Sequence, residues 1–270
     1  RAFSSTSLAF FVFILTLFES YVLYTYVRKY VPPSWYWFSI FIFMVNPSNM
    51  LTCISMMRQY LAMSLFIFAI KYIITGKFIR YLILILAAAL IHTSAIILLP
   101  IYFIRNVNMS IFNKKSFILL LTFLVALWYI RGAYYCGDII NNMLSLELFQ
   151  RYELYADSDE GAISLGLSSL LYVLLFYLSI SSIKFSNREE AILILISLFG
   201  ILILPLGVNI SLISRLSFYF TYALIFVCPI VLKKIKRIEL RYLMIIMMLV
   251  FYTNSFLSFF NSSEVHHTVS

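Results

Sequence analysis

Residues 46–92 read NPSNMLTCISMMRQYLAMSLFIFAIKYIITGKFIRYLILILAAALIH, and this stretch decides the fold that we expect. Two apolar runs flank a short basic turn around Gly76. The first run contains Arg58 and Gln59, and the second contains His92. An ionisable side chain in a bilayer is costly unless it is buried in protein or faces a water-filled cavity. We therefore predict two membrane-embedded helical segments whose polar side chains take part in function.

The composition of the whole chain supports a polytopic membrane protein. Hydrophobic residues make up 63% of the 270 residues and charged residues only 11%, which lies outside the range of soluble domains. Apolar runs recur at lengths near the ~20 residues that a helix needs to cross the hydrocarbon core. The predicted fold class is all-α, a polytopic helical bundle integral to the membrane.

Charge and cysteine usage exclude several other function classes. The net charge of +9 comes from short basic clusters between apolar runs, as the positive-inside rule produces, so we expect no nucleic-acid partner. Cys53, Cys136 and Cys228 have no paired spacing, so we expect no metal site and no disulfide framework, and we expect no cofactor. No signal-peptide pattern follows Arg1. We expect one transmembrane domain over residues 1–270 that is incomplete at its N-terminus.

Breaks between the apolar runs predict where the spans begin and end. The predicted spans are Ser7–Tyr26, the short aromatic run Trp35–Val45, Met50–Ile70, Ser116–Ile130, Leu165–Ile183, Ala191–Leu204, Leu216–Leu232 and Tyr242–Phe260. The one long hydrophilic stretch, residues 131–163, carries more than half of the 11 acidic residues. We predict that this stretch is a large non-cytoplasmic loop.

The run Tyr81–Ile104 has two interpretations. It could cross the membrane once, or it could enter and return as a re-entrant hairpin of two half-helices with His92 at the tip. A hairpin puts most of the 20 lysines and arginines on one side of the membrane, whereas a single crossing splits them between the sides. The charge bias therefore favours the hairpin. The other side then holds five arginines and no lysine: Arg1, Arg58, Arg131, Arg151 and Arg215.

Arg58 and His92 are the first candidates for a functional site. At 1.5 Å per residue, Arg58 lies ~20 Å from Lys71, beyond the middle of a ~30 Å core, and deeper than an arginine that snorkels usually sits. Arginine also suits bidentate binding of phosphate. Structural alternatives remain open for each residue. Backbone carbonyls at the Asn46–Asn49 break could satisfy Arg58, a local hydroxyl or carbonyl could satisfy His92, and Gln59 could only join helices.

Two further groups of side chains are weaker candidates. Arg215 follows a break at Pro205 and Gly207, and it could either bind substrate or snorkel to the interface. The long loop clusters tyrosines with charges that could form a sugar-binding surface or only a solvated face. These loop candidates are Arg151, Tyr152, Glu153, Tyr155 and Asp157.

Several short motifs follow one another between Asn46 and Pro100. They are Asn46-Pro47, Met57-Arg58-Gln59-Tyr60-Leu61-Ala62, Lys71-Tyr72, Lys77-Phe78 and His92-Thr93-Ser94-Ala95, with Pro100 after them. Their order and spacing resemble those of the EpsG-like family of Wzy-type polysaccharide polymerases. The signature of that family is an (I/M)RQ-x-LA helix followed by an (F/I)H-x-SA segment. The resemblance extends loosely to the loop at residues 151–166 and to the helix of Arg215.

The resemblance implies a glycosyltransferase that polymerises lipid-linked oligosaccharide repeat units into capsule, exopolysaccharide or O-antigen. Donor and acceptor would be polyprenyl-pyrophosphate-linked oligosaccharides at the outer face of the bacterial cytoplasmic membrane. Flippase and chain-length regulator proteins would be its partners. Arg58 and Arg215 would stabilise the leaving pyrophosphate without a metal ion.

The remaining candidates take supporting roles in this scheme. His92 would accept the proton of the acceptor hydroxyl, with Glu153 or Asp157 as a second candidate base. The residues that would contact pyrophosphate or glycan besides the two arginines are Gln59, Arg151, Tyr152 and Tyr155.

Three other functions stay open on the residues alone. A transporter or flippase of lipid-linked glycan would also use intramembrane arginine and broken helices, although it would more often show internal repeats, and this sequence shows none. A membrane acyltransferase that modifies glycans would also need an intramembrane His and Arg. A purely structural membrane subunit would need neither.

Overall fold

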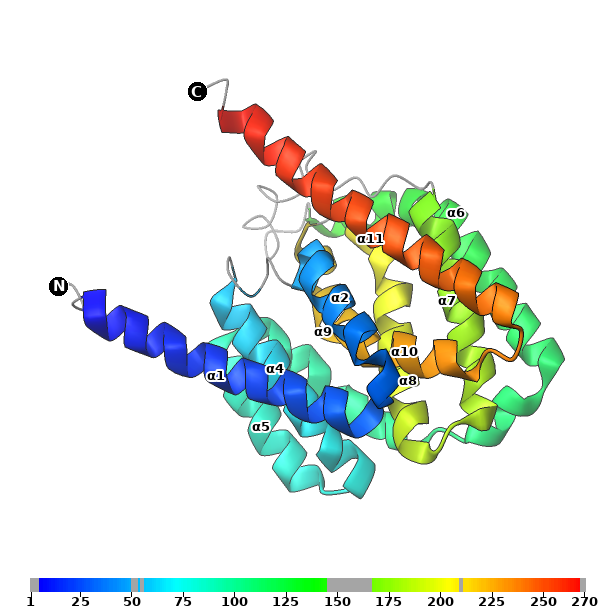
Figure 1. The fold of residues 1–270 in the computed structure, drawn as a ribbon, viewed down its shortest axis with the longest axis horizontal. Helices are drawn as coiled ribbons and strands as arrows, with labels where there is room; N and C mark the ends of the chain where they lie inside the picture. Colours follow the sequence, from blue (N-terminus) through cyan, green and yellow to red (C-terminus); the bar gives the residue numbers. More distant parts are fainter. Residues whose placement is uncertain (1–4, 50–52, 54–55, 145–166, 209–210, 268–270) are drawn as a thin grey trace. The chain divides into compact units, whose positions relative to one another are not determined.

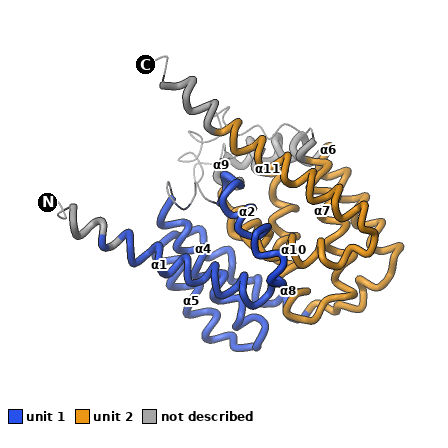
Figure 2. The backbone as a smooth tube through the Cα atoms, viewed as in Figure 1, with its two compact units in different colours: residues 1–106 blue, residues 107–270 orange. Residues whose placement is uncertain are grey.

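The computed structural model describes residues 5–49, 53, 56–144, 167–208 and 211–267 (Figure 1). These residues form helices and no strand, which confirms the predicted all-α class. Three of the described helices are long and apolar enough to cross a membrane, or four if one bent pair counts as a single span. The chain divides into two compact units, residues 1–106 and residues 107–270 (Figure 2).

The first unit begins with two helices joined by a proline-containing turn. α1 (Ser5–Tyr30) leads through the 3₁₀ turn η1 (Pro33–Trp35) into α2 (Tyr36–Val45). Pro32 and the proline after it lack backbone N–H groups, so a helix cannot continue through them. α2 stops at Asn46, which takes an extended conformation and accepts a hydrogen bond from the Ser48 N–H at 3.1 Å. Both predicted spans in this region are therefore helical.

α4 (Met57–Thr75) is a candidate membrane span and is shifted from the predicted span Met50–Ile70. It continues past Lys71 because the long side chain folds back over apolar surface, with its Nζ 3.4 Å from the centroid of the Phe68 ring. It ends at Gly76, whose φ of 75° is the left-handed conformation that glycine adopts without strain. α4 therefore ends at Gly76 and not at Lys71.

The chain folds back on itself within the ambiguous run Tyr81–Ile104. α5 (Phe78–Ile91) is followed by an extended residue, His92, and then by the 3₁₀ helix η2 (Thr93–Asn106). A straight helix would separate residues 78 and 102 by ~36 Å. Instead, the ring centroids of Phe78 and Tyr102 lie 4.9 Å apart. The two half-helices are therefore a hairpin with His92 at its corner, as the charge count favoured.

Side chains close the open end of this hairpin. The Tyr81 hydroxyl donates to the Leu98 carbonyl at 2.5 Å, which joins α5 to η2. Farther along η2, the guanidinium of Arg105 packs directly over Gly76 at the α4–α5 turn. The end of η2 therefore returns to the turn from which α5 starts, and α4, α5 and η2 form one packed group (Figure 1).

The described residues of the second unit form six α-helices and several 3₁₀ turns. In chain order they are η3 (Met109–Asn113), α6 (Lys115–Leu144), α7 (Leu167–Ser182), η6 (Ile183–Phe185), α8 (Arg188–Ile203), η7 (Leu204–Val208), α9 (Ser211–Thr221), α10 (Leu224–Lys234) and α11 (Ile238–His267). α6 extends beyond the predicted span Ser116–Ile130 and into the range predicted as a loop. Residues 145–166 of that loop lie outside the described residues. The predicted span Leu216–Leu232 is broken into α9 and α10, which meet at a bend of 46°.

The end of α8 is tied to α6 and packed tightly against α9. Pro205 has no N–H to donate to the Ile201 carbonyl, and the Tyr129 hydroxyl donates to that carbonyl instead, at 2.6 Å. A Cβ added at Gly200 would lie 2.8 Å from the backbone nitrogen of Thr221, which shows how closely the two helices approach. The break after α8 is therefore supported from two sides within this unit.

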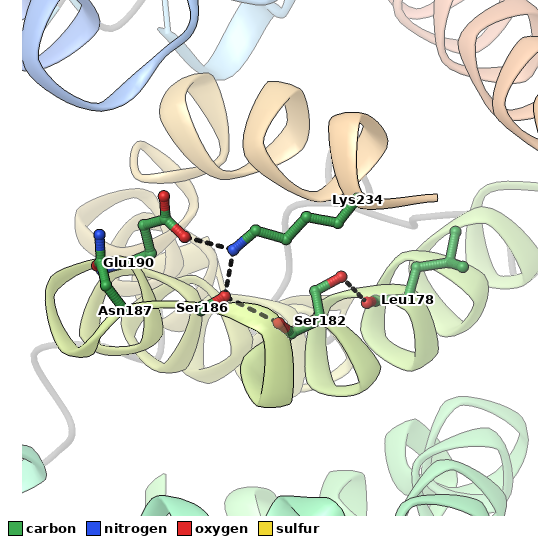
Figure 3. Close-up of polar contacts among 6 residues, drawn as sticks. All are labelled: Leu178, Ser182, Ser186, Asn187, Glu190 and Lys234. Atoms are coloured by element: carbon green, nitrogen blue, oxygen red, sulfur yellow. Dashed lines mark hydrogen bonds and ion pairs between the residues drawn. The ribbon is translucent and has the colours of Figure 1, made fainter. Parts of the chain in front are cut away.

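A polar clamp joins the start of α8 to the end of α10 (Figure 3). The Lys234 ammonium donates to the Ser186 hydroxyl and to the Glu190 carboxylate. Asn187 caps α8 by accepting a hydrogen bond from the Glu190 N–H at 2.8 Å. The clamp holds this end of the second unit together at its basic boundary.

Candidate functional site

The strongest candidate site lies at the start of α4, where Arg58 is the second helical residue. The first turn of a helix has backbone N–H groups without intrahelical acceptors and carries a partial positive charge. The residue before the helix, Met56, provides no side-chain cap to these groups. The helix start and the guanidinium of Arg58 together form an electropositive end that suits a phosphate group.

The structure changes the predicted environment of Arg58. The residue lies in the first turn of the span and not within its middle, because α4 begins at Met57. Its side chain is exposed, whereas the next residue, Gln59, is 2% exposed and packs inward. Among the residues that the structure describes, the Arg58 guanidinium makes no hydrogen bond or ion pair. Its donors are therefore available to an anion.

At the Asn46–Asn49 break, a side chain of the break itself binds a backbone carbonyl at the end of α2. The side chain of Asn49, which is 1% exposed, donates to the Ile42 carbonyl at the end of α2 at 3.4 Å. The structural alternative for Arg58 assigned such carbonyls to its guanidinium. Because the Asn49 side chain already donates to the Ile42 carbonyl, Arg58 is not needed as a hydrogen-bond donor to that carbonyl.

His92 forms the corner between α5 and η2. Its φ of −144° and ψ of 107° are extended, its N–H donates to Ala88 and its carbonyl accepts from Ala95, both at 2.9 Å. The side chain is half-buried. A residue at a helix break presents its side chain where the regular packing of helices is interrupted. His92 is therefore held in place by backbone bonds on both sides.

Arg58 and His92 lie at the same end of the first unit. α4 and α5 run in opposite directions from the Gly76 turn and pack along each other. Counting 1.5 Å per residue, Arg58 lies about 27 Å from this turn and His92 about 24 Å. The two residues are therefore at nearly equal height, at the end of the unit opposite the basic turn.

One buried carboxyl adds to the polar groups of the first unit. Glu19 on α1 is 5% exposed, and its Oε2 accepts a hydrogen bond from the Cys53 thiol at 3.7 Å. Cys53 belongs to the segment that leads into α4 and precedes Arg58 by five residues. The sequence indicated only that Glu19 lay within a span, since no spacing rule pairs residues 34 positions apart.

The other predicted site residues belong to the second unit. Arg215 lies within α9, which begins at Ser211, and its side chain is half-buried. Arg215 therefore lies one turn into the helix, whereas the predicted span Leu216–Leu232 put it just before the helix start. The loop candidates lie outside the described residues: Arg151, Tyr152, Glu153, Tyr155 and Asp157.

The EpsG family model matches residues 2–268, almost the entire chain. The chain belongs to the EpsG family. Membership assigns this EpsG-family protein in general terms to membrane proteins of polysaccharide biosynthesis with glycosyltransferase-like activity. No curated protein and no solved structure matches the chain. Roles for individual residues of this EpsG-family protein are therefore inferred from their chemistry and their position in the structure.

Proposed function

We propose that the protein is a repeat-unit polymerase of the bacterial cytoplasmic membrane. It transfers a growing glycan from one polyprenyl-pyrophosphate carrier to a hydroxyl of another lipid-linked repeat unit. The product is a capsule, exopolysaccharide or O-antigen chain. The observation that carries this proposal is the match of the EpsG family over residues 2–268.

The proposed chemistry is a displacement at the anomeric carbon of the donor glycan. The acceptor oxygen forms a bond to this carbon, and the bond between the carbon and the pyrophosphate oxygen breaks. The electron pair leaves with the polyprenyl pyrophosphate, and the proton of the acceptor hydroxyl passes to neutral His92. Arg58 and the N–H groups at the start of α4 stabilise the charge that develops on the leaving pyrophosphate.

The arrangement of the first unit supports these two roles. Arg58 is exposed at a helix start that attracts anions, and His92 lies at nearly the same height on the adjacent hairpin. Gln59 and, from the second unit, Arg215 are further proposed contacts to the pyrophosphate. Arg151, Tyr152 and Tyr155 are proposed contacts to the glycan, and Glu153 or Asp157 is the alternative base.

The test replaces Arg58 and His92 singly by Ala and measures glycan chain length on gels and the protein level in membranes. We expect each change to slow polymerisation by about 10²–10³-fold and to leave single repeat units on carrier lipid. Arg80→Ala is the matched control for Arg58→Ala, because it removes an exposed arginine from the opposite end of the packed group of α4, α5 and η2. Long chains that persist in both variants at normal protein levels would refute the mechanism.

An assay with purified components separates polymerisation from the other functions. The purified protein in detergent micelles is given lipid-linked repeat units and no acyl donor. A polymerase lengthens the glycan under these conditions, whereas a transporter has no membrane to cross and an acyltransferase has no acyl group to transfer. Arg58→Lys keeps the positive charge but cannot bind phosphate bidentately. We therefore expect this variant to retain only part of the polymerisation rate of the unchanged protein.

A further inference from the structure

A cavity between α1 and α2 lies apart from the residues of the proposed active site. Its volume is about 550 Å³, within the range of small-molecule sites. The last three turns of α1 and the first turns of α2 line it. The residues that matter for its chemistry are Leu23, Tyr24, Val27, Arg28, Tyr36 and Ile40.

The cavity is apolar along most of its lining and cationic at one end. Leu23, Val27 and Ile40 contribute aliphatic surface. The Arg28 guanidinium is exposed, donates a hydrogen bond to the Tyr24 hydroxyl and lies 5.8 Å from the centroid of that ring. An arginine with five N–H donors keeps further donors for an external anion. The cavity therefore matches a ligand with a hydrocarbon chain and a phosphate.

The cationic end has no carboxylate nearby in its own unit. Glu19 is the only acidic residue among residues 1–106. It precedes Arg28 by nine residues, about 14 Å along α1, and its carboxylate accepts a hydrogen bond from Cys53. Lys29 adds a second cation beside Arg28. Within this unit no carboxylate lies near these two cations, which favours an anionic ligand at this end of the cavity.

The position of this end along α1 selects the kind of anion. Arg28 and Lys29 occupy the last turn of a predicted membrane helix, at the level where lipid headgroups lie. Ile40, which lines the cavity, is 56% exposed and opens it toward the apolar surroundings of the unit. A membrane lipid can reach such a cavity with its acyl chain while its phosphate stays at the interface.

We propose that this cavity binds an anionic glycerophospholipid. One acyl chain occupies the space between α1 and α2, and the phosphate binds Arg28. The site is independent of the proposed glycan chemistry, because none of its residues belongs to the Arg58 and His92 end of the unit. Its occupation would fix the packing of α2 on α1.

The test uses the full chain in nanodiscs that contain equal amounts of phosphatidylglycerol and phosphatidylcholine. Mass spectrometry measures which phospholipid stays with the protein after extraction into mild detergent. We expect retained phosphatidylglycerol in excess over phosphatidylcholine, and about fivefold less of it after Arg28→Gln. The matched control is Arg80→Gln, because Arg80 is also exposed at a basic boundary but lies outside the cavity.

A second variant tests the apolar part of the site. Ile40→Trp fills the cavity from the lipid-facing side and should release both phospholipids while Arg28 stays in place. Equal retention of the two lipids by the unchanged protein would overturn the proposal even if a variant fails to fold. Equal losses in Arg28→Gln and Arg80→Gln would also overturn it, as would displacement of phosphatidylglycerol by stoichiometric polyprenyl phosphate, which would make the cavity a carrier-lipid site.

Discussion

The contact between Gly76 and Arg105 lies at the open end of the hairpin that carries His92. A Cβ built at Gly76 would lie 2.1 Å from the Arg105 Nη1 and 2.7 Å from its Cζ, far inside van der Waals contact. Gly76→Ala therefore has two separate effects. It forces alanine into the left-handed conformation, with φ at 75°, and it displaces the guanidinium from the α4–α5 turn.

The two effects can be estimated separately. Left-handed backbone costs a residue with a Cβ about 1–2 kcal/mol. Displacing Arg105 removes the hydrogen bond that its Nη1 donates to the Tyr102 hydroxyl at 2.8 Å, which is worth about 1 kcal/mol. We therefore expect Gly76→Ala to lower the free energy of unfolding by about 2–3 kcal/mol.

A double-mutant cycle isolates the contact with Arg105. The free energy of unfolding is measured in mixed micelles of dodecyl maltoside and SDS for Gly76→Ala, Arg105→Ala and the double variant. Once Arg105 is truncated, the new methyl group meets no guanidinium, so the costs should fall short of additive by about 1 kcal/mol. Gly76→Asn serves as the matched variant. Asparagine tolerates the left-handed conformation, so the cost of this variant comes mainly from the clash of its Cβ with the Arg105 guanidinium.

Additivity would refute this account. If the two single costs sum to the double cost within about 0.5 kcal/mol, Arg105 does not pack on Gly76. If Gly76→Asn is as stable as the unchanged protein while Arg105 is present, the close approach at 2.1 Å is absent. The chain-length assay then shows whether loosening this turn affects glycan synthesis at the other end of the hairpin.

The second unit offers three further predictions, each measured as a change in the free energy of unfolding in the same micelles. Tyr129→Phe should cost about 0.6–2 kcal/mol, because a carbonyl of α8 loses its donor, whereas Tyr242→Phe should be neutral since that ring is exposed. Gly200→Ala should cost about 1–3 kcal/mol, because the methyl group meets the Thr221 backbone, and equal stability would exclude the close helix approach. Lys234→Met should cost about 1 kcal/mol or more, because the Ser186 hydroxyl and the Glu190 carboxylate lose their donor. If Lys234→Met costs the same in a Glu190→Gln background, the clamp is excluded.

The local features of the hairpin followed from sequence rules. Glycine at the end of an apolar run predicts a helix terminus, and Gly76 ends α4. The sign and spacing of basic residues distinguished a hairpin from a single crossing, because each crossing changes the side on which the next cluster lies. The order of the Arg58 and His92 motifs resembled the EpsG-like family, and the family match over residues 2–268 agrees with it.

Contacts between distant residues did not follow from such rules. The Cys53 thiol meets the Glu19 carboxylate, and the Arg105 guanidinium meets Gly76, across stretches of chain with no common period. The start of α4 was also misplaced, since apolar composition continues without a break from Met50 into the helix. That difference moved Arg58 from the middle of a span to its first turn.

The sequence alone determined the class of this protein, the number and order of its apolar segments, the turn at Gly76 and the residue types of its candidate site. These features depend on composition and on periods that are local in the chain. The tertiary structure decided the bend between α9 and α10, the Arg105 contact on Gly76 and the exposure of Arg58 beside buried Gln59. Such features depend on which surfaces meet when helices pack, and packing joins residues whose separation in sequence carries no signal.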